Sequence, residues 1–304
     1  MLGNILLFIF LFVALILCWQ FISSIFSRSE FNIYKHVSFF AVLVKEHDHD
    51  FIRSWVKIFF MLLKLILLAI IIRSLDFFSF TENPDYFIGS RGVQITYAGL
   101  FYGVVVWEIL SAIEYFFEED MKKESTFEIL KKPVFFLLFL FSFSSYYQTP
   151  FSDYIVLRQR EELYYGILNL GCISHIFFFL LFYFYISHDL KRLGASIIQH
   201  KIGLLSNIIG FAKIFILQIF LIYAYLGWTS QVPLMEIVID RFPNSGAIFE
   251  VLSLLAKLIC VHLCGLLGSQ FLGNINSRYV RGIERYLQLL SGVNALLLIG
   301  IRLW

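Results

Sequence analysis

The sequence predicts an all-α fold, a polytopic bundle of about eight transmembrane helices that forms a single membrane domain over residues 1–304. Hydrophobic residues make up 59% of the chain and charged residues only 15%, which is more apolar surface than one soluble core can bury. The apolar residues gather into long runs, and the basic residues fall mostly into alternate connections between those runs. Both features are typical of a membrane protein.

Each apolar run is predicted to be one span, because a helix needs roughly 20 apolar residues to cross the hydrocarbon core of a bilayer. The first run follows Met1 directly, without a basic segment or a small-residue cleavage site, so we expect a span and not a removable signal peptide. The fourth run is short, and we expect it to tilt little or to be locally irregular. In chain order the eight runs are Ile5–Ile25, Val56–Leu75, Ile95–Phe117, Pro133–Tyr147, Tyr165–Ile186, Leu204–Gly227, Ile248–Phe271 and Leu287–Leu303.

The basic residues predict the orientation, because Lys and Arg are retained on the inner side of a membrane. Each odd-numbered connection carries at least three of them, whereas the even-numbered connections hold only Arg91, Arg158, Arg160 and Arg241. Both termini are therefore expected on the outer side. The stretch Gly273–Tyr286 is predicted to be the last inner connection, and its arginines would anchor the final hairpin.

The last hundred residues hold a longer pattern: an apolar helix that ends in a Gly-Trp turn, a helix with one lysine, the arginine-rich connection and a terminal helix. This order resembles the C-terminal half of the NADH dehydrogenase subunit 1 family, the quinone-site membrane subunit of respiratory complex I, called the H subunit in bacteria. A Lys-Glu pair resembles the end of that family's first inner loop. The matching residues are Lys45, Glu46, Ala212, Lys213, Gly227, Trp228, Lys257, Arg278 and Tyr279.

The chain also departs from the family. The third inner loop of the family carries a Pro-Phe-Asp segment and several glutamates, whereas Ser187–Lys201 offers Asp189 as its only acid. Gly210 stands where the family has a glutamate, and the Asp-Gln that follows the family's arginines is missing. The resemblance therefore predicts the place of the chain in a complex better than it predicts its chemistry.

The resemblance implies a non-redox subunit of proton-translocating NADH:ubiquinone reductase. Such a subunit forms the membrane end of the quinone tunnel and the junction between the hydrophilic arm and the proton-pumping arm. It binds no metal or cofactor itself; ubiquinone is the substrate, and the iron–sulfur cluster and FMN belong to partner subunits. The implied partners are quinone-module subunits, membrane-arm subunits, lipid and quinone, with no nucleic acid. The implied location is the mitochondrial inner membrane or a bacterial plasma membrane.

Charged residues inside the runs are the candidates for chemistry, because an ion at the bilayer centre costs roughly 2.5–3.5 kcal/mol on insertion scales. Glu108, Lys213 and Lys257 are the candidate catalytic relay residues, and a buried carboxylate suits proton uptake and release. The alternative for Glu108 is an interhelical ion pair that fixes the bundle. Glu114 and Lys64 are expected to reach the inner interface. The candidates for the quinone tunnel or subunit docking are Arg28, Lys45, Glu46, Asp189, Lys191, Arg192, Arg278, Arg281 and Arg285.

Three other interpretations stay open. The chain could be the homologous membrane subunit of an energy-converting hydrogenase, an unrelated transporter or channel, or a subunit with a mainly structural role.

His175 and His262 lie inside runs and could ligate a haem if they faced each other. The four cysteines form no CxxC pair, and we expect them to pack as small apolar side chains.

Overall fold

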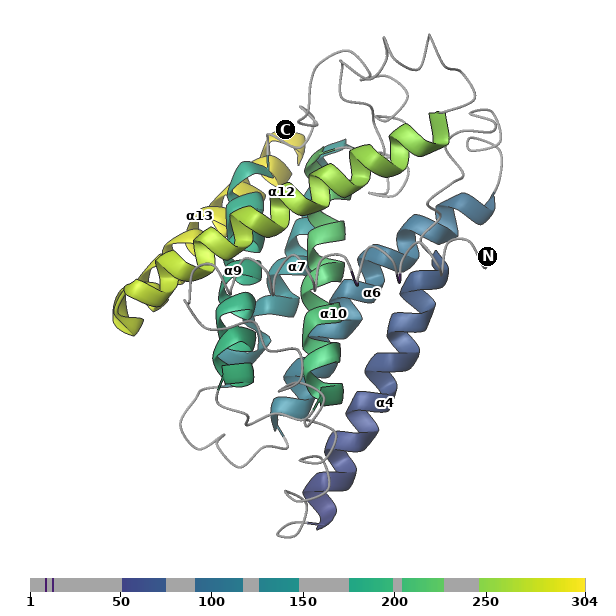
Figure 1. The fold of residues 1–304 in the computed structure, drawn as a ribbon. Helices are drawn as coiled ribbons and strands as arrows, with labels where there is room; N and C mark the ends of the chain where they lie inside the picture. Colours follow the sequence, from purple (N-terminus) through teal and green to yellow (C-terminus); the bar gives the residue numbers. More distant parts are fainter. Residues whose placement is uncertain are drawn as a thin grey trace.

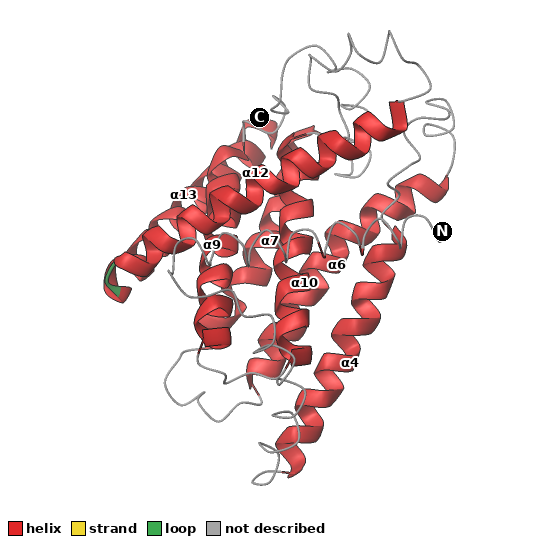
Figure 2. Cartoon of the chain, viewed as in Figure 1, coloured by secondary structure: helices red, strands yellow, loops and turns green. Residues whose placement is uncertain are grey.

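The computed structural model describes residues 51–74, 91–116, 126–147, 175–198, 204–226 and 246–303, together with Ile9 and Val13. Within these ranges the regular elements are all helical, as Figure 2 shows, so the all-α prediction is confirmed for this part of the chain. The helices are α4 (Phe51–Ser74), α6 (Arg91–Phe116), α7 (Thr126–Tyr147), α9 (Ile176–Ile198), α10 (Leu204–Leu221) with a π turn η3 (Ile222–Leu226), α12 (Gly246–Asn274) and α13 (Ser277–Leu303).

Two of these helices are long and apolar enough to cross a membrane, at Ile208–Leu226 and Leu254–Asn274, and a shorter apolar segment covers Ile58–Ile72. This is a smaller number than the predicted eight spans. The first predicted span, Ile5–Ile25, lies outside the described residues except for Ile9 and Val13. The described residues therefore form an all-helical fold with weak support for membrane insertion.

A Phe-rich core joins the central helices of the bundle. Phe136 of α7 stacks on Phe182 of α9, with ring centroids 4.4 Å apart, and meets Phe220 of α10 edge-on at 5.4 Å. Phe139, one turn further along α7, packs against the same two rings at 5.3 and 5.9 Å. Phenylalanines three and four residues apart share one face of a helix, and aromatic pairs prefer such offset or edge-to-face contacts.

The remaining helices are arranged around this core. α4 lies at one edge of the bundle and packs mainly on α6, while α12 and α13 form a hairpin that crosses α9 and α7 at the other side (Figure 1). At Gly103 of α6, an added Cβ would lie 2.6 Å from Cγ1 of the buried Ile71 of α4, so only glycine allows these helices to approach this closely.

Three helices are longer at their charged ends than the apolar runs predicted. α7 begins at Thr126 and not at Pro133, α9 continues past Ile186 to Ile198, and α13 begins at Ser277 and not at Leu287. Gly273–Tyr286 is therefore helical except for a short turn at Ile275 and Asn276, and the predicted third inner loop, Ser187–Lys201, is helical as far as Ile198. Hydropathy finds only the part of a helix that suits lipid, whereas backbone hydrogen bonding continues into polar sequence that has no breaker.

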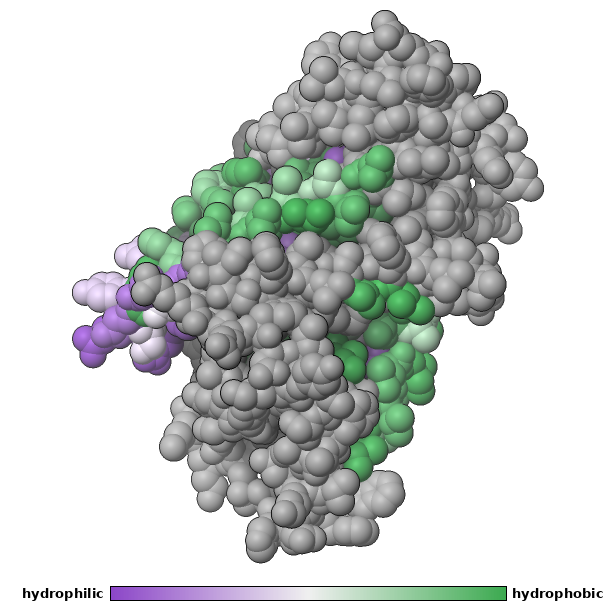
Figure 3. Space-filling model, viewed as in Figure 1, coloured by the Kyte–Doolittle hydropathy of each residue, from purple (hydrophilic) through white to green (hydrophobic). Residues whose placement is uncertain are grey.

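The turn between α12 and α13 shows how the second helix starts. The Oδ1 of Asn276 accepts a hydrogen bond from the backbone N–H of Arg278 at 3.1 Å, and its carbonyl accepts one from Tyr279 at 2.9 Å. This is the pattern of an asparagine N-cap. Hydrophilic side chains gather at this end of the molecule, while apolar side chains cover the visible length of the hairpin (Figure 3).

Candidate functional site

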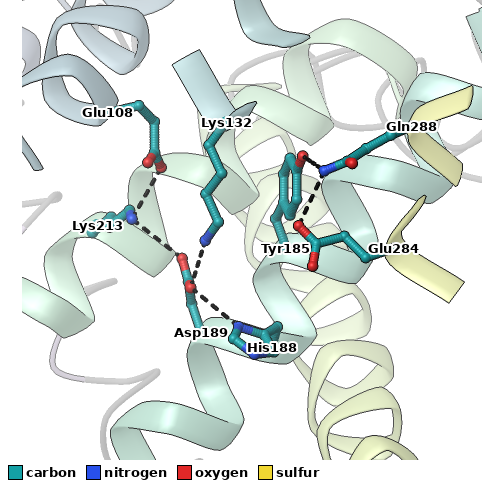
Figure 4. Close-up of polar contacts among 8 residues, drawn as sticks. All are labelled: Glu108, Lys132, Tyr185, His188, Asp189, Lys213, Glu284 and Gln288. Atoms are coloured by element: carbon teal, nitrogen blue, oxygen red, sulfur yellow. Dashed lines mark hydrogen bonds and ion pairs between the residues drawn. The ribbon is translucent and has the colours of Figure 1, made fainter. Parts of the chain in front are cut away.

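Four charged side chains from four helices meet inside the bundle. They alternate in sign and form what we name the buried charge line: Glu108 of α6, Lys213 of α10, Asp189 of α9 and Lys132 of α7 (Figure 4). The four formal charges sum to zero when all are ionised. Alternation matters here, because a buried charge without a partner is strongly destabilising.

Lys213 is the shared member of the line. Its Nζ lies 3.0 Å from Oε1 of Glu108 and 3.3 Å from Oδ2 of Asp189. Glu108 is 3% exposed, while the Lys213 and Asp189 side chains are 19% and 13% exposed. One ammonium group therefore bridges two carboxylates that belong to helices far apart in the sequence.

Lys132 closes the other end of the line. Its Nζ donates a hydrogen bond of 2.7 Å to Oδ1 of Asp189, so each oxygen of this carboxylate faces a different lysine. Burial alone would raise the pKa of Asp189, but the two ammonium groups outweigh burial and hold that pKa well below its usual range. Asp189 lies beyond the predicted span that ends at Ile186, and it is ionised at neutral pH.

Further polar groups connect the line to α13. Nζ of Lys132 lies 5.0 Å from the centre of the Tyr185 ring, within the range of a cation–π contact. The Tyr185 hydroxyl accepts a 3.2 Å hydrogen bond from Gln288, and the same amide donates to Glu284 at 3.0 Å. Lys132 is thereby held between a carboxylate and an aromatic face.

A second ion pair lies elsewhere on α6. Lys64 of α4 donates to Oε2 of Glu114, and these side chains are 10% and 21% exposed. The sequence predicted that both would reach the inner interface. The structure joins the two side chains, so the pair links α4 to α6.

The structure brings together two of the three predicted relay residues, Glu108 and Lys213, and adds Asp189 from the docking candidates. Lys257 is buried on α12, a helix that supplies none of the four members of the line. Lys132 was not predicted as a site residue because it precedes Pro133, where the predicted span began. Gln288 was not predicted because only charged residues inside the apolar runs were taken as candidates.

The other docking candidates that the structure describes lie on α9 and α13. Lys191 donates a 2.7 Å hydrogen bond to the carbonyl of Leu272 near the end of α12. The three α13 arginines lie on its first turns, and Arg192 lies on α9. The α13 arginines are Arg278, Arg281 and Arg285. Three further candidates, Arg28, Lys45 and Glu46, lie outside the described residues.

The two histidines that lie inside predicted runs have separate surroundings. His175 packs against the rings of Phe139 and Phe143, whereas Nδ1 of His262 is 2.9 Å from Nε2 of Gln218. The structure therefore does not pair them as the two ligands of one haem. Among the described residues, no group of three or more His, Cys, Asp and Glu side chains is arranged to hold a metal ion.

Comparison of the chain with models of protein families, with curated proteins and with solved structures finds no match in any of the three.

Proposed function

We propose that this chain is a membrane subunit of a proton-translocating redox complex, of the NADH:quinone reductase type, in which the buried charge line carries protons. The observation that carries the proposal is the sharing of Lys213 between Glu108 and Asp189 inside an apolar bundle. The residue pattern that resembles the quinone-site subunit of complex I supports this class of complex.

The geometry suits proton transfer between neighbours. A donor and an acceptor exchange a proton at about 2.6–3.2 Å or through one water. The 2.7 Å hydrogen bond of Lys132 to Asp189 meets this condition. The 3.0 Å separation of Lys213 and Glu108 lies within the same distance range, and alignment of the two groups as a hydrogen bond needs a movement of the lysine. The 3.3 Å contact of Lys213 with Asp189 lies just beyond this range and needs only a small movement of a flexible lysine.

The energetics also favour a functional role over a purely structural one. Replacing a buried ion pair by well-packed apolar residues is often neutral, or stabilising by about 1–4 kcal/mol. The helices around the line already pack through phenylalanines such as Phe136 and Phe182. Four buried charges are therefore a costly way to hold these helices together, and a proton path gives a reason to keep them.

The wider assignment follows the residue pattern. As such a subunit, the chain would work in the mitochondrial inner membrane or a bacterial plasma membrane beside partner subunits that hold FMN and iron–sulfur clusters. Reduction of ubiquinone by those partners would drive protons along the line. The arginines at the start of α13 would face the hydrophilic arm.

One experiment tests the class of complex. The intact assembly is extracted in mild detergent, and its subunits and redox centres are identified. Partners with FMN and iron–sulfur clusters would support the proposal. A nickel–iron subunit would identify the hydrogenase alternative, and a lone homo-oligomer that moves a solute would overturn the proposal in favour of a transporter.

A second experiment tests the line itself. The assembly is reconstituted in vesicles, and proton translocation driven by quinone reduction is compared between wild type and Glu108→Gln. Glu114→Gln is the matched control, because it removes the same type of charge from the same helix but leaves the line complete. Unchanged translocation in Glu108→Gln would contradict the proposed relay.

A further inference from the structure

His188 contacts the buried charge line and is more exposed than any of the four members of the line. It directly precedes Asp189 on α9, and its side chain is 44% exposed, whereas Asp189 is 13% exposed. The Nδ1 atom of His188 lies 3.9 Å from Oδ1 of Asp189 (Figure 4). The four members of the line are each between 3% and 24% exposed.

The His188 ring has a defined position. It stacks on Phe184, one turn earlier on α9, with ring centroids 6.2 Å apart and an interplanar angle of 18°. Phe184 is itself buried in the core. Because Nδ1 of His188 faces the carboxylate of Asp189, Nε2 is the nitrogen that would exchange protons with water.

We propose that His188 is the proton-uptake residue of the buried charge line, the side chain that takes protons from water and delivers them to Asp189. This inference rests on the proposed function, because it names the point at which the same relay is loaded. An imidazole suits the role, since near neutral pH it can accept a proton on one nitrogen and release another from the second.

The transfer balances as a sequence of single proton steps. Lys213 first gives a proton to Glu108, which leaves a neutral amine and a neutral carboxylic acid. His188 binds a proton from water at Nε2 and releases the proton on Nδ1 to Asp189, which passes one proton to the neutral Lys213. Asp189 is then ionised again, His188 is neutral again with its proton on Nε2, and Glu108 holds the translocated proton. Rotation of the ring, or proton exchange with water, restores the starting tautomer of His188 before the next transfer.

The order of these steps follows from the charges around Asp189. While Lys132 and Lys213 are both protonated, the carboxylate stays ionised and does not keep a proton. Loss of the Lys213 proton removes one of the two cations and makes Asp189 a better acceptor. The separation of 3.9 Å exceeds the range for direct transfer, so a bridging water or a small rotation of the ring completes the contact.

The test uses the intact complex in vesicles, with His188→Gln, which removes the exchangeable ring but keeps a polar side chain of moderate size. Translocation is expected to slow by at least about tenfold, on the scale of a lost acid–base group. Imidazole added at millimolar concentration should restore much of the rate. His262→Gln is the control, because His262 is buried beside Gln218, and imidazole should not accelerate that variant.

Two results would overturn the inference: a wild-type rate in His188→Gln, or a reduced rate that imidazole does not restore, which would indicate a structural role. Glu108→Gln, measured in parallel, separates this failure from failure of the proposed function. If Glu108→Gln is inactive while His188→Gln is active, the relay stands and only its loading point is wrong. If Glu108→Gln also translocates normally, the relay itself is wrong.

Discussion

The second half of α6 carries two carboxylates, Glu108 and Glu114. They differ in whether their lysine partner also contacts a second acid. Glu114 pairs with Lys64, and this acid is 21% exposed. Glu108, six residues earlier, is 3% exposed and depends on Lys213, which also serves Asp189. One helix thus carries a separate ion pair and one end of a longer line of charges.

A shared lysine can do what a lysine in a separate pair cannot. A separate pair has one favourable arrangement, and moving its proton would leave a neutral pair in place of an ion pair. A lysine between two carboxylates can lose a proton on one side and regain one on the other. Residue type cannot distinguish the two cases, since both use a glutamate and a lysine.

Proton translocation should show the strongest contrast between the two acids. Glu108→Gln should lower the rate on the order of a hundredfold, because it removes the acceptor at the end of the line. Glu114→Gln should leave the rate close to wild type. Both rates are measured by a pH-sensitive dye in vesicles that contain the whole complex. Equal losses of rate in the two variants would show that Glu108 and Glu114 do not differ in their role.

The next contrast concerns stability. Lys213→Met should lower the free energy of unfolding by about 3–5 kcal/mol, because it leaves the buried carboxylate of Glu108 without its cation and leaves Asp189 with Lys132 alone. Lys64→Met should cost less, since it strands one acid that is closer to solvent. Denaturation in mixed micelles measures both variants, and a greater loss in Lys64→Met would reverse the ranking of the two lysines.

A double mutant checks the cause of that loss. Adding Glu108→Gln to Lys213→Met should recover part of the lost stability, because the side chain that lost its cation is then neutral. Simple additivity of the two substitutions would show that Lys213 and Glu108 do not interact in the folded protein.

A weaker effect is expected at the contact between α4 and α6. Gly103→Ala should destabilise the fold by about 1–3 kcal/mol, because the new methyl group would overlap the buried Ile71. Gly282→Ala on α13 is the control, since nothing described lies within 4 Å of its added Cβ. There the gain in helix propensity should stabilise by up to about 1 kcal/mol. A neutral Gly103→Ala would mean that α4 and α6 are further apart.

The weakest effect is expected at the α13 end of the network. Gln288→Leu should cost about 1–2 kcal/mol. The buried Tyr185 hydroxyl loses its amide donor, which is worth about 0.5–1.5 kcal/mol, and the weaker contact between Gln288 and Glu284 one turn away is lost as well. Translocation should stay near wild type, since Gln288 lies outside the four-residue line. A loss as large as that of Glu108→Gln would extend the proton path to α13.

Much of the helical architecture could be predicted from the sequence, and part of the site could be too. Six predicted runs overlap described helices along most of their length, from Val56–Leu75 to Leu287–Leu303, and a seventh, Tyr165–Ile186, overlaps α9 over its second half. Glu108 and Lys213 could be identified as candidates from the sequence, because a charged side chain inside an apolar run is costly to bury. Asp189 and Lys132 did not stand out as relay residues, because the edge of each run was taken as the end of a helix.

The amino-acid sequence alone was enough to indicate which segments are helical and that Glu108 and Lys213 must find partners, because burying a lone charge is too costly. The choice of those partners came from tertiary packing. Glu108, Lys132, Asp189 and Lys213 lie on four different helices, and their contact depends on how those helices pack, which the spacing of residues along one helix does not encode. The same packing placed Lys64 beside Glu114 and left Glu108 to share Lys213 with a second acid.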